Sequence, residues 1–118
     1  MFSFQNLQVW HESRCLVTRV YRLVGQLPIE ERFALSDQLR RAVVSIPTNI
    51  AEGTSRFSDK EKAHFIEIAY GSLCEVYSLL VTARDLDYIT DENLDDQHVQ
   101  IEAVGRMLCK LRSEYLSR

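Results

Sequence analysis

Apolar residues recur every three or four positions along most of the chain, which is the spacing of one face of an α-helix. Turn signals divide this pattern into four stretches: residues 6–25, residues 36–54, residues 58–86 and a last one that has Thr90 or Asp91 as its expected N-cap. No segment has the two-residue alternation of a strand, and no internal repeat is present. Four amphipathic helices with short connections predict an all-α fold, an antiparallel up-down four-helix bundle, in a single domain spanning residues 1–118.

The first predicted helix presents a broad apolar face of the kind that packs in a bundle. Asn6 is placed to act as its N-cap, and Gly25 and Pro28 mark its end. We expect the residues after Pro28 to form a short turn, with Phe33 packed against the core.

The second predicted helix contains a proline within its apolar pattern. We expect it to begin with Ser36 as the N-cap and to end near Thr54. Pro47 removes a backbone hydrogen bond and costs roughly 3 kcal/mol inside a helix. The apolar row nevertheless continues from Ile46 to Ile50. The pattern therefore predicts a helix that is kinked at Pro47 but not ended by it.

The third predicted helix has the clearest start, because Ser58 followed by Glu61 is the sequence of a capping box. Its expected core row is Phe65, Ile66, Ala69, Leu73, Val76, Leu80 and Ala83. For the fourth helix the expected buried row is Leu94, His98, Ile101, Val104, Leu108, Leu111 and Tyr115.

More apolar surface is present than one small bundle covers, which indicates self-association. The second helix carries an outer stripe of small residues, Val44, Pro47 and Ala51, and the third carries Tyr70, Tyr77 and Val81 beyond its core row. These six residues are the predicted subunit interface. Because two unlike patches meet in such a contact, it closes into a ring when the rotation allows, and we expect a cyclic homo-oligomer.

Charge is unevenly spread along the chain. The net charge is −3, which gives no general attraction to nucleic acid, and residues 85–102 hold seven acids without a lysine or arginine. The remainder has a surplus of basic residues. Arg40, Arg41, Arg56 and Lys60 are therefore the candidate nucleic-acid contacts, although arginines on an exposed helix face are more often simply solvated.

A polar flank of the second helix, Ser45, Asn49, Glu52 and Arg56, has two interpretations. It is either a hydrogen-bonded collar that offsets Pro47 and fixes the next turn, or a recognition surface. The sequence favours the collar, with Glu52 and Arg56 spaced for an ion pair.

Signs of catalysis or of a cofactor are weak. Glu61 and His64 have the spacing of one half of a di-iron motif, but a second half is missing, so we expect no metal and no cofactor. No nucleophile, base and orienting group can be assembled, so we expect a protein that is not an enzyme. Three widely spaced cysteines predict reduced thiols in the cytoplasm, and no apolar run is expected to span a membrane.

Several strings resemble the small four-helix-bundle family of 23S rRNA intervening-sequence proteins. They are Leu7-Gln8-Val9-Trp10, Gln38-Leu39-Arg40-Arg41-Ala42, Ser45-Ile46-Pro47-Thr48-Asn49-Ile50-Ala51-Glu52-Gly53, Ser55-Arg56-Phe57-Ser58 and Ala69-Tyr70-Gly71-Ser72-Leu73-Cys74-Glu75. The resemblance implies a ring, typically a pentamer, in the bacterial cytoplasm. A similar ring is the accessory protein of diversity-generating retroelements, which binds a reverse transcriptase and nucleic acid. That relative is basic, whereas this chain is acidic.

Together these features predict a non-enzymatic, ring-forming interaction module that binds other copies of itself. The alternative is an RNA-binding or nucleic-acid-binding protein that uses a local basic face around Arg40, Arg41 and Arg56, alone or with a nucleic-acid-processing protein.

Overall fold

The computed structural model describes all 118 residues and contains helices and no strand. Its elements are the 3-10 helix η1 (Ser3–Asn6), α1 (Gln8–Val24), the 3-10 helix η2 (Ile29–Glu31), α2 (Leu35–Thr54), α3 (Asp59–Asp85) and α4 (Asp91–Leu116). The prediction of an all-α fold with four main helices is confirmed.

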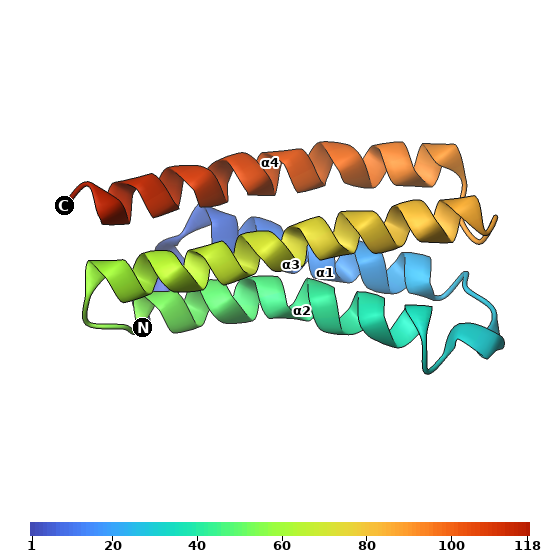
Figure 1. Cartoon of the computed structure of the whole chain (residues 1–118), viewed down its shortest axis with the longest axis horizontal. Helices are drawn as coiled ribbons and strands as arrows, with labels where there is room; N and C mark the ends of the chain where they lie inside the picture. Colours follow the sequence, from blue (N-terminus) through green and yellow to red (C-terminus); the bar gives the residue numbers. More distant parts are fainter.

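The four helices lie along one axis, and the chain reverses direction at each connection (Figure 1). The molecule measures 46 × 24 × 22 Å. α3 packs extensively against both α2 and α4, and the contact between α1 and α4 is the smallest of those between neighbouring α-helices. Both chain termini lie at the same end as the α2–α3 turn (Figure 1).

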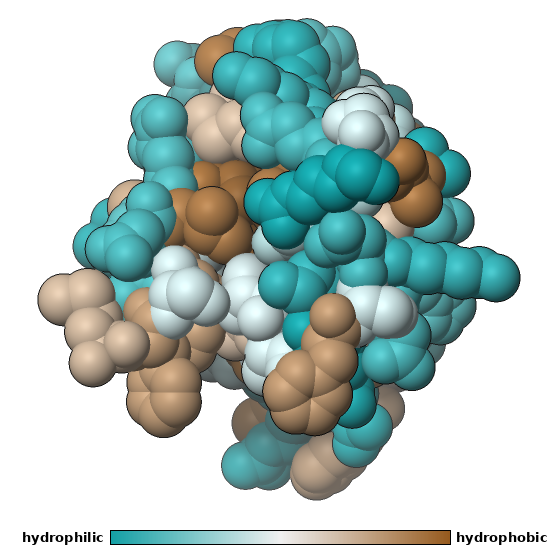
Figure 2. Space-filling model, turned by 90° about the vertical axis from the view of Figure 1, so that its left-hand side faces the viewer, coloured by the Kyte–Doolittle hydropathy of each residue, from teal (hydrophilic) through white to brown (hydrophobic).

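The buried apolar residues form one cluster that runs the length of the bundle. Its largest fully buried members are Leu16, Leu39, Ile46, Ile50, Ile66, Leu80 and Leu108. At the end that holds both termini, shown in Figure 2, apolar side chains also interrupt the hydrophilic surface. Phe2 and Phe57, which belong to this end, are 72% and 104% exposed.

Helix α2 continues through Pro47, as predicted, with Ile46 and Ile50 fully buried on either side. Neighbouring side chains supply hydrogen bonds to the backbone around the proline. Asn49 Nδ2 donates to the Ser45 carbonyl at 2.7 Å, and Thr48 Oγ1 donates to the Val44 carbonyl at 2.9 Å. The bend at Pro47 stays a prediction.

Two of the predicted helix caps are confirmed. Ser58 Oγ accepts a hydrogen bond from the Glu61 amide at 3.1 Å, and Thr90 Oγ1 accepts one from the Asn93 amide at 3.0 Å. Each satisfies an amide that the first turn of a helix leaves without a partner.

The two other predicted caps are wrong. Asn6 ends η1, so α1 begins at Gln8 without a side-chain cap. Ser36 lies inside α2 and is buried, because the helix begins one residue earlier, at Leu35. There the Glu31 side chain accepts from the Leu35 amide at 3.3 Å, a bond that takes the place of a serine cap.

Three burial predictions also fail. Phe33 is 87% exposed, since it lies in the η2–α2 turn, where the chain bulges beyond the helices (Figure 1). Phe65 is only half-buried, and Ala63 occupies the core in that turn of α3. On α4 the core position expected for His98 is taken by Gln97, which is 8% exposed and leaves Oε1 without a hydrogen-bond partner.

The expectation that no segment could span a membrane is also wrong as a statement about length and composition. α3 is long enough and apolar enough to cross a bilayer, although one such helix is weak evidence because core helices have the same character. Only 28% of its most apolar stretch is buried inside the chain. α3 therefore exposes apolar surface that the other three helices do not cover.

Candidate interaction surface between α3 and α4

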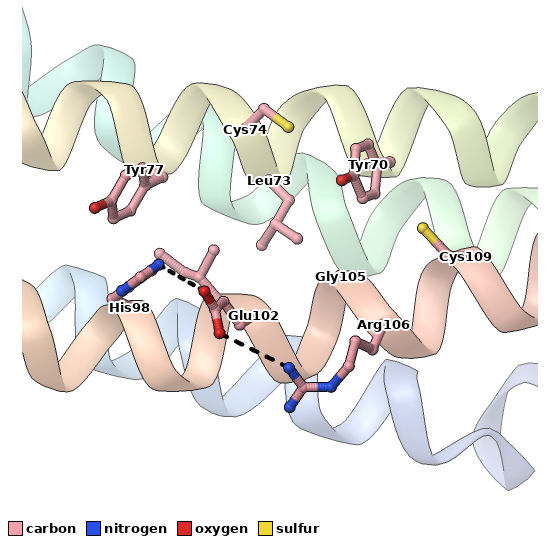
Figure 3. Close-up of a pocket in the computed structure, with 10 residues that line it drawn as sticks. Tyr70, Leu73, Cys74, Tyr77, His98, Glu102, Gly105, Arg106 and Cys109 are labelled. Carbon is pink, nitrogen blue, oxygen red and sulfur yellow. Dashed lines mark ion pairs between the residues drawn. The ribbon is translucent and has the colours of Figure 1, made fainter.

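A hollow of about 530 Å³ lies between the middle parts of α3 and α4 (Figure 3). Its lining residues are Tyr70, Leu73, Cys74 and Tyr77 from α3 and His98, Ile101, Glu102, Gly105, Arg106 and Cys109 from α4. A second hollow of about 450 Å³ shares Tyr70 and Cys109 with the first and continues to Glu67, Gly71 and Arg112. We call the two together the α3/α4 groove.

Two glycines, Gly71 on α3 and Gly105 on α4, leave the α3/α4 groove without a side chain at those positions. A Cβ atom added to Gly105 would meet Leu73 at 3.4 Å, an ordinary contact, whereas one added to Gly71 would meet nothing within 4 Å. Glycine inside a helix costs roughly 1 kcal/mol relative to alanine. No packing within the chain therefore requires a glycine at position 71.

Charged side chains form the rim of the groove on α4. His98 Nε2 lies 2.9 Å from Glu102, and Arg106 lies 3.8 Å from the other oxygen of the same carboxylate (Figure 3). The Tyr77 ring lies 4.9 Å from the His98 ring. At the second hollow Arg112 pairs with Glu67 at 3.3 Å. An apolar floor with a polar rim is the usual composition of a protein interface.

The predicted interface residues fall into two places. Tyr70 and Tyr77 line the α3/α4 groove, and Val81 is half-buried against the core one turn beyond Tyr77. Val44, Pro47 and Ala51 lie on α2, which contributes nothing to the groove.

Within the α2 stripe the exposure differs along its length. Val44 is exposed and Pro47 half-buried, whereas Ala51 lines a different hollow, which the N-terminal segment also lines with Phe2 and Phe4. The part of the stripe around Val44 and Pro47 is therefore the part left free by the chain's own N-terminal segment.

The polar flank of α2 has the contacts expected of a collar. Ser45 Oγ hydrogen-bonds to Ser72 on α3, Asn49 donates to Ser45, and Arg56 pairs with Glu52 at 2.9 Å. The Arg56 guanidinium also lies 4.4 Å from the centre of the Phe65 ring, which joins the end of α2 to α3. An exposed ion pair one turn apart contributes only about 0.3–0.5 kcal/mol, so Ser45 and Asn49 are the more important members.

The candidate nucleic-acid contacts are not brought into one patch. Arg40 lies near the start of α2 and Arg56 lies just beyond its end at Thr54, and the helix between Arg40 and Thr54 alone is about 21 Å long. Arg41 pairs with Asp37 at 3.0 Å, and Arg40 donates to the Arg32 carbonyl at 3.4 Å. Lys60 is at the far end of α2 from both, in the first turn of α3.

The chemistry available at these surfaces is limited. No group of three or more His, Cys, Asp or Glu side chains comes together in a way that could hold a metal ion. The three cysteines are free and exposed, and two of them line the α3/α4 groove. The residues that α4 contributes to the groove were not predicted from the sequence. Gly105, a glycine inside a helix, is the signal that could have indicated them.

Comparisons with known proteins agree with the fold and with the sequence resemblance. The family model described as 23S rRNA-intervening sequence protein matches residues 5–110. A crystal structure from Bacteroides thetaiotaomicron, of a protein with unknown function from the S23 ribosomal protein family, is similar in fold. It has a TM-score of 0.80 and 24% sequence identity, over 87% of this chain and 96% of that one. No curated protein matches the chain.

Proposed function

Because the chain belongs to the 23S rRNA-intervening sequence protein family, we propose that it is a non-enzymatic interaction module that assembles with copies of itself into a ring. The observation that carries the proposal is the α3/α4 groove, whose apolar floor has no partner within the chain. Its expected place is the cytoplasm, where exposed thiols without a disulfide partner stay reduced.

A second copy fits the groove through the outer stripe of α2. Val44 and Pro47 are small, uncharged and accessible, so a helix that presents them can approach the backbone at Gly71 closely. The tyrosines of the groove then bury large apolar area against that helix. Since the two surfaces are different, repetition of the contact leads to a closed ring. The number five rests on the family resemblance alone.

Another copy explains the uncovered surface of α3 better than a lipid bilayer does. Glu67 and Glu75 interrupt the apolar stretch of α3, and both are exposed. Carboxylates at membrane depth cost several kcal/mol. At a protein interface they can stay at the solvated rim, as Glu67 does beside Arg112.

The test is the mass of the assembly by light scattering, at tens of micromolar protein as an order of magnitude. We expect the wild type to be larger than one 13.7 kDa chain. Gly71→Glu should reduce the mass to that of one chain, because it places a charged side chain in the groove. Val44→Glu should do the same from the other side of the contact.

Thr18→Glu is the matched control, since it adds the same charge to an exposed position on α1. It should leave the mass unchanged. A wild type that is monomeric under these conditions would contradict the proposal, and a full-sized Gly71→Glu assembly would show that the contact lies elsewhere.

A further inference from the structure

Two of the three cysteines line the α3/α4 groove. Cys74 comes from α3 and Cys109 from α4, and both thiols are free and exposed. Cys109 lines both hollows, and in Figure 3 its sulfur points from α4 toward α3. Cys15 is exposed on α1 and lines neither hollow, so the chain contains its own reference thiol.

Two arginines flank Cys109 along the groove, Arg106 at the first hollow and Arg112 at the second. Their side chains are 72% and 46% exposed and pair with one carboxylate each. Exposed pairs of this kind are weak, and a guanidinium has five N–H donors, so both can bind a further carboxylate. Beside the two carboxylates that they pair with, both guanidiniums therefore keep donors that an anionic reagent next to the thiol can use.

The larger hollow is also of a suitable size. Its volume of about 530 Å³ falls within the range of small-molecule sites, roughly 300–1,000 Å³. Its floor includes Leu73, Tyr70 and Gly105, which can contact the apolar part of a small thiol compound.

We propose that Cys109 forms a mixed disulfide with an anionic low-molecular-weight disulfide, and that this adduct fills the groove and prevents self-assembly. The regulatory part rests on the ring contact proposed above. Because Cys109 lines both hollows, an adduct there keeps a second copy's helix away from Gly71 in one and Gly105 in the other, and the added carboxylates make the groove more negative.

The reaction is a thiol–disulfide exchange and needs no further oxidant. The Cys109 thiolate attacks one sulfur of the disulfide, the bond between the two reagent sulfurs breaks, and a new bond to Cys109 forms. The second half of the reagent leaves as a thiolate, which takes up the proton that Cys109 lost. Cys109 is oxidised and the departing half is reduced, and an added dithiol reverses the exchange.

The experiment uses glutathione disulfide as the probe and follows intact mass, peptide mapping and light scattering on the full chain. We expect one adduct at Cys109 and an increase of at least about tenfold in the dissociation constant of the assembly. Dithiothreitol should restore the original mass. Cys109→Ser should show the same mass of assembly before and after treatment with the reagent, while Cys15→Ser, outside the groove, should respond as the wild type does.

The outcomes separate this inference from the proposed function. If the untreated wild type is monomeric, the ring contact fails and the regulatory inference fails with it. If the wild type assembles and its mass is unchanged after Cys109 carries the adduct, only this inference is overturned. An effect that persists in Cys109→Ser, or that disappears in Cys15→Ser, also overturns it. Cystamine, a cationic disulfide, should modify Cys109 more slowly than glutathione disulfide, and equal or faster modification would contradict the role of the arginines.

Discussion

At the scale of single residues, two glycines on neighbouring helices have opposite surroundings. A Cβ atom at Gly53 would lie 3.0 Å from the Phe65 Cβ and 3.3 Å from the Lys62 carbonyl oxygen, so α2 and α3 meet there almost backbone to backbone. Gly71 faces open space. In the sequence both are simply glycines within or beside an apolar row. Whether folding requires a glycine at either position depends on how closely the neighbouring helix packs against it.

Alanine at these two positions should change stability in opposite directions. Gly53→Ala should destabilise the monomer by about 1–3 kcal/mol, because β-carbon and backbone must move apart. Gly71→Ala should stabilise it by up to about 1 kcal/mol through helix propensity. Urea unfolding at low protein concentration, where subunit contacts contribute least, measures both. Destabilisation of similar size at both positions would mean that Gly71 has an intramolecular role.

At the scale of elements, one hydrogen bond joins the two connections at the far end of the bundle. The Tyr88 hydroxyl, in the α3–α4 turn, donates to the Glu31 carboxylate of η2 at 2.9 Å, across 57 residues of sequence. The same turn contains Asp87, whose φ of 63° is the one positive φ in the chain. This hydrogen bond holds the α3–α4 turn against η2, the segment that precedes α2.

The hydrogen bond to Glu31 raises the pKa of Tyr88 above its ordinary value of 10.0, with loss of hydration as the second cause. A pKa that is higher in the folded state contributes stability below the unfolded value, and this contribution is lost as pH rises through the folded value. We expect wild type to be more stable than Tyr88→Phe below pH 10.0, with the difference shrinking above it.

Chemical unfolding of both proteins on either side of that pH measures the effect. Tyr115, whose pKa is raised mainly by burial, is present in both proteins, so its titration cancels in the comparison. A difference that is independent of pH would assign Tyr88 a packing role instead.

The helix caps and the groove also show which features of the structure can be predicted from the sequence. Ser58 and Thr90 were predicted correctly because a cap uses amides within three residues of itself. Asn6 and Ser36 fit the same rule, yet η1 and the Glu31 side chain replace them, and both belong to neighbouring segments. In the groove, Tyr70 and Tyr77 followed from the excess of apolar surface on α3, but their α4 neighbours depend on how two helices align.

At the scale of the whole molecule, charge is separated along the 46 Å axis. The end formed by residues 26–37 and 84–96 holds nine acidic side chains and two arginines. Two of the acids, Asp85 and Asp91, pair with Arg84, and Asp91 and Glu92 also face the positive N-terminus of α4. The acidic side chains that have no basic partner repel one another, so their charge destabilises this end of the folded protein.

Added salt should therefore stabilise the protein. Raising the ionic strength from about 0.01 M to 0.15 M shortens the screening length from about 30 Å to about 8 Å. We expect the free energy of unfolding in urea to rise by a few tenths of a kcal/mol to about 1 kcal/mol, the scale of exposed charge interactions. Asp95→Asn with Asp96→Asn should reduce this salt dependence, whereas Glu114→Gln, at the opposite end, should not. Stability that falls with salt would indicate that attractive pairs dominate.

The long direction of the α3/α4 groove has a consequence for any ring built through it. If α2 of the next copy lies along the groove with little crossing, the rotation between copies is about an axis close to the helix direction, and every copy stands the same way up. All the acidic ends then emerge on one rim, and all the α2–α3 turns, with their exposed Phe57, on the other. The two rims of such a ring therefore differ in chemistry. A partner that binds one rim meets several identical sites at once.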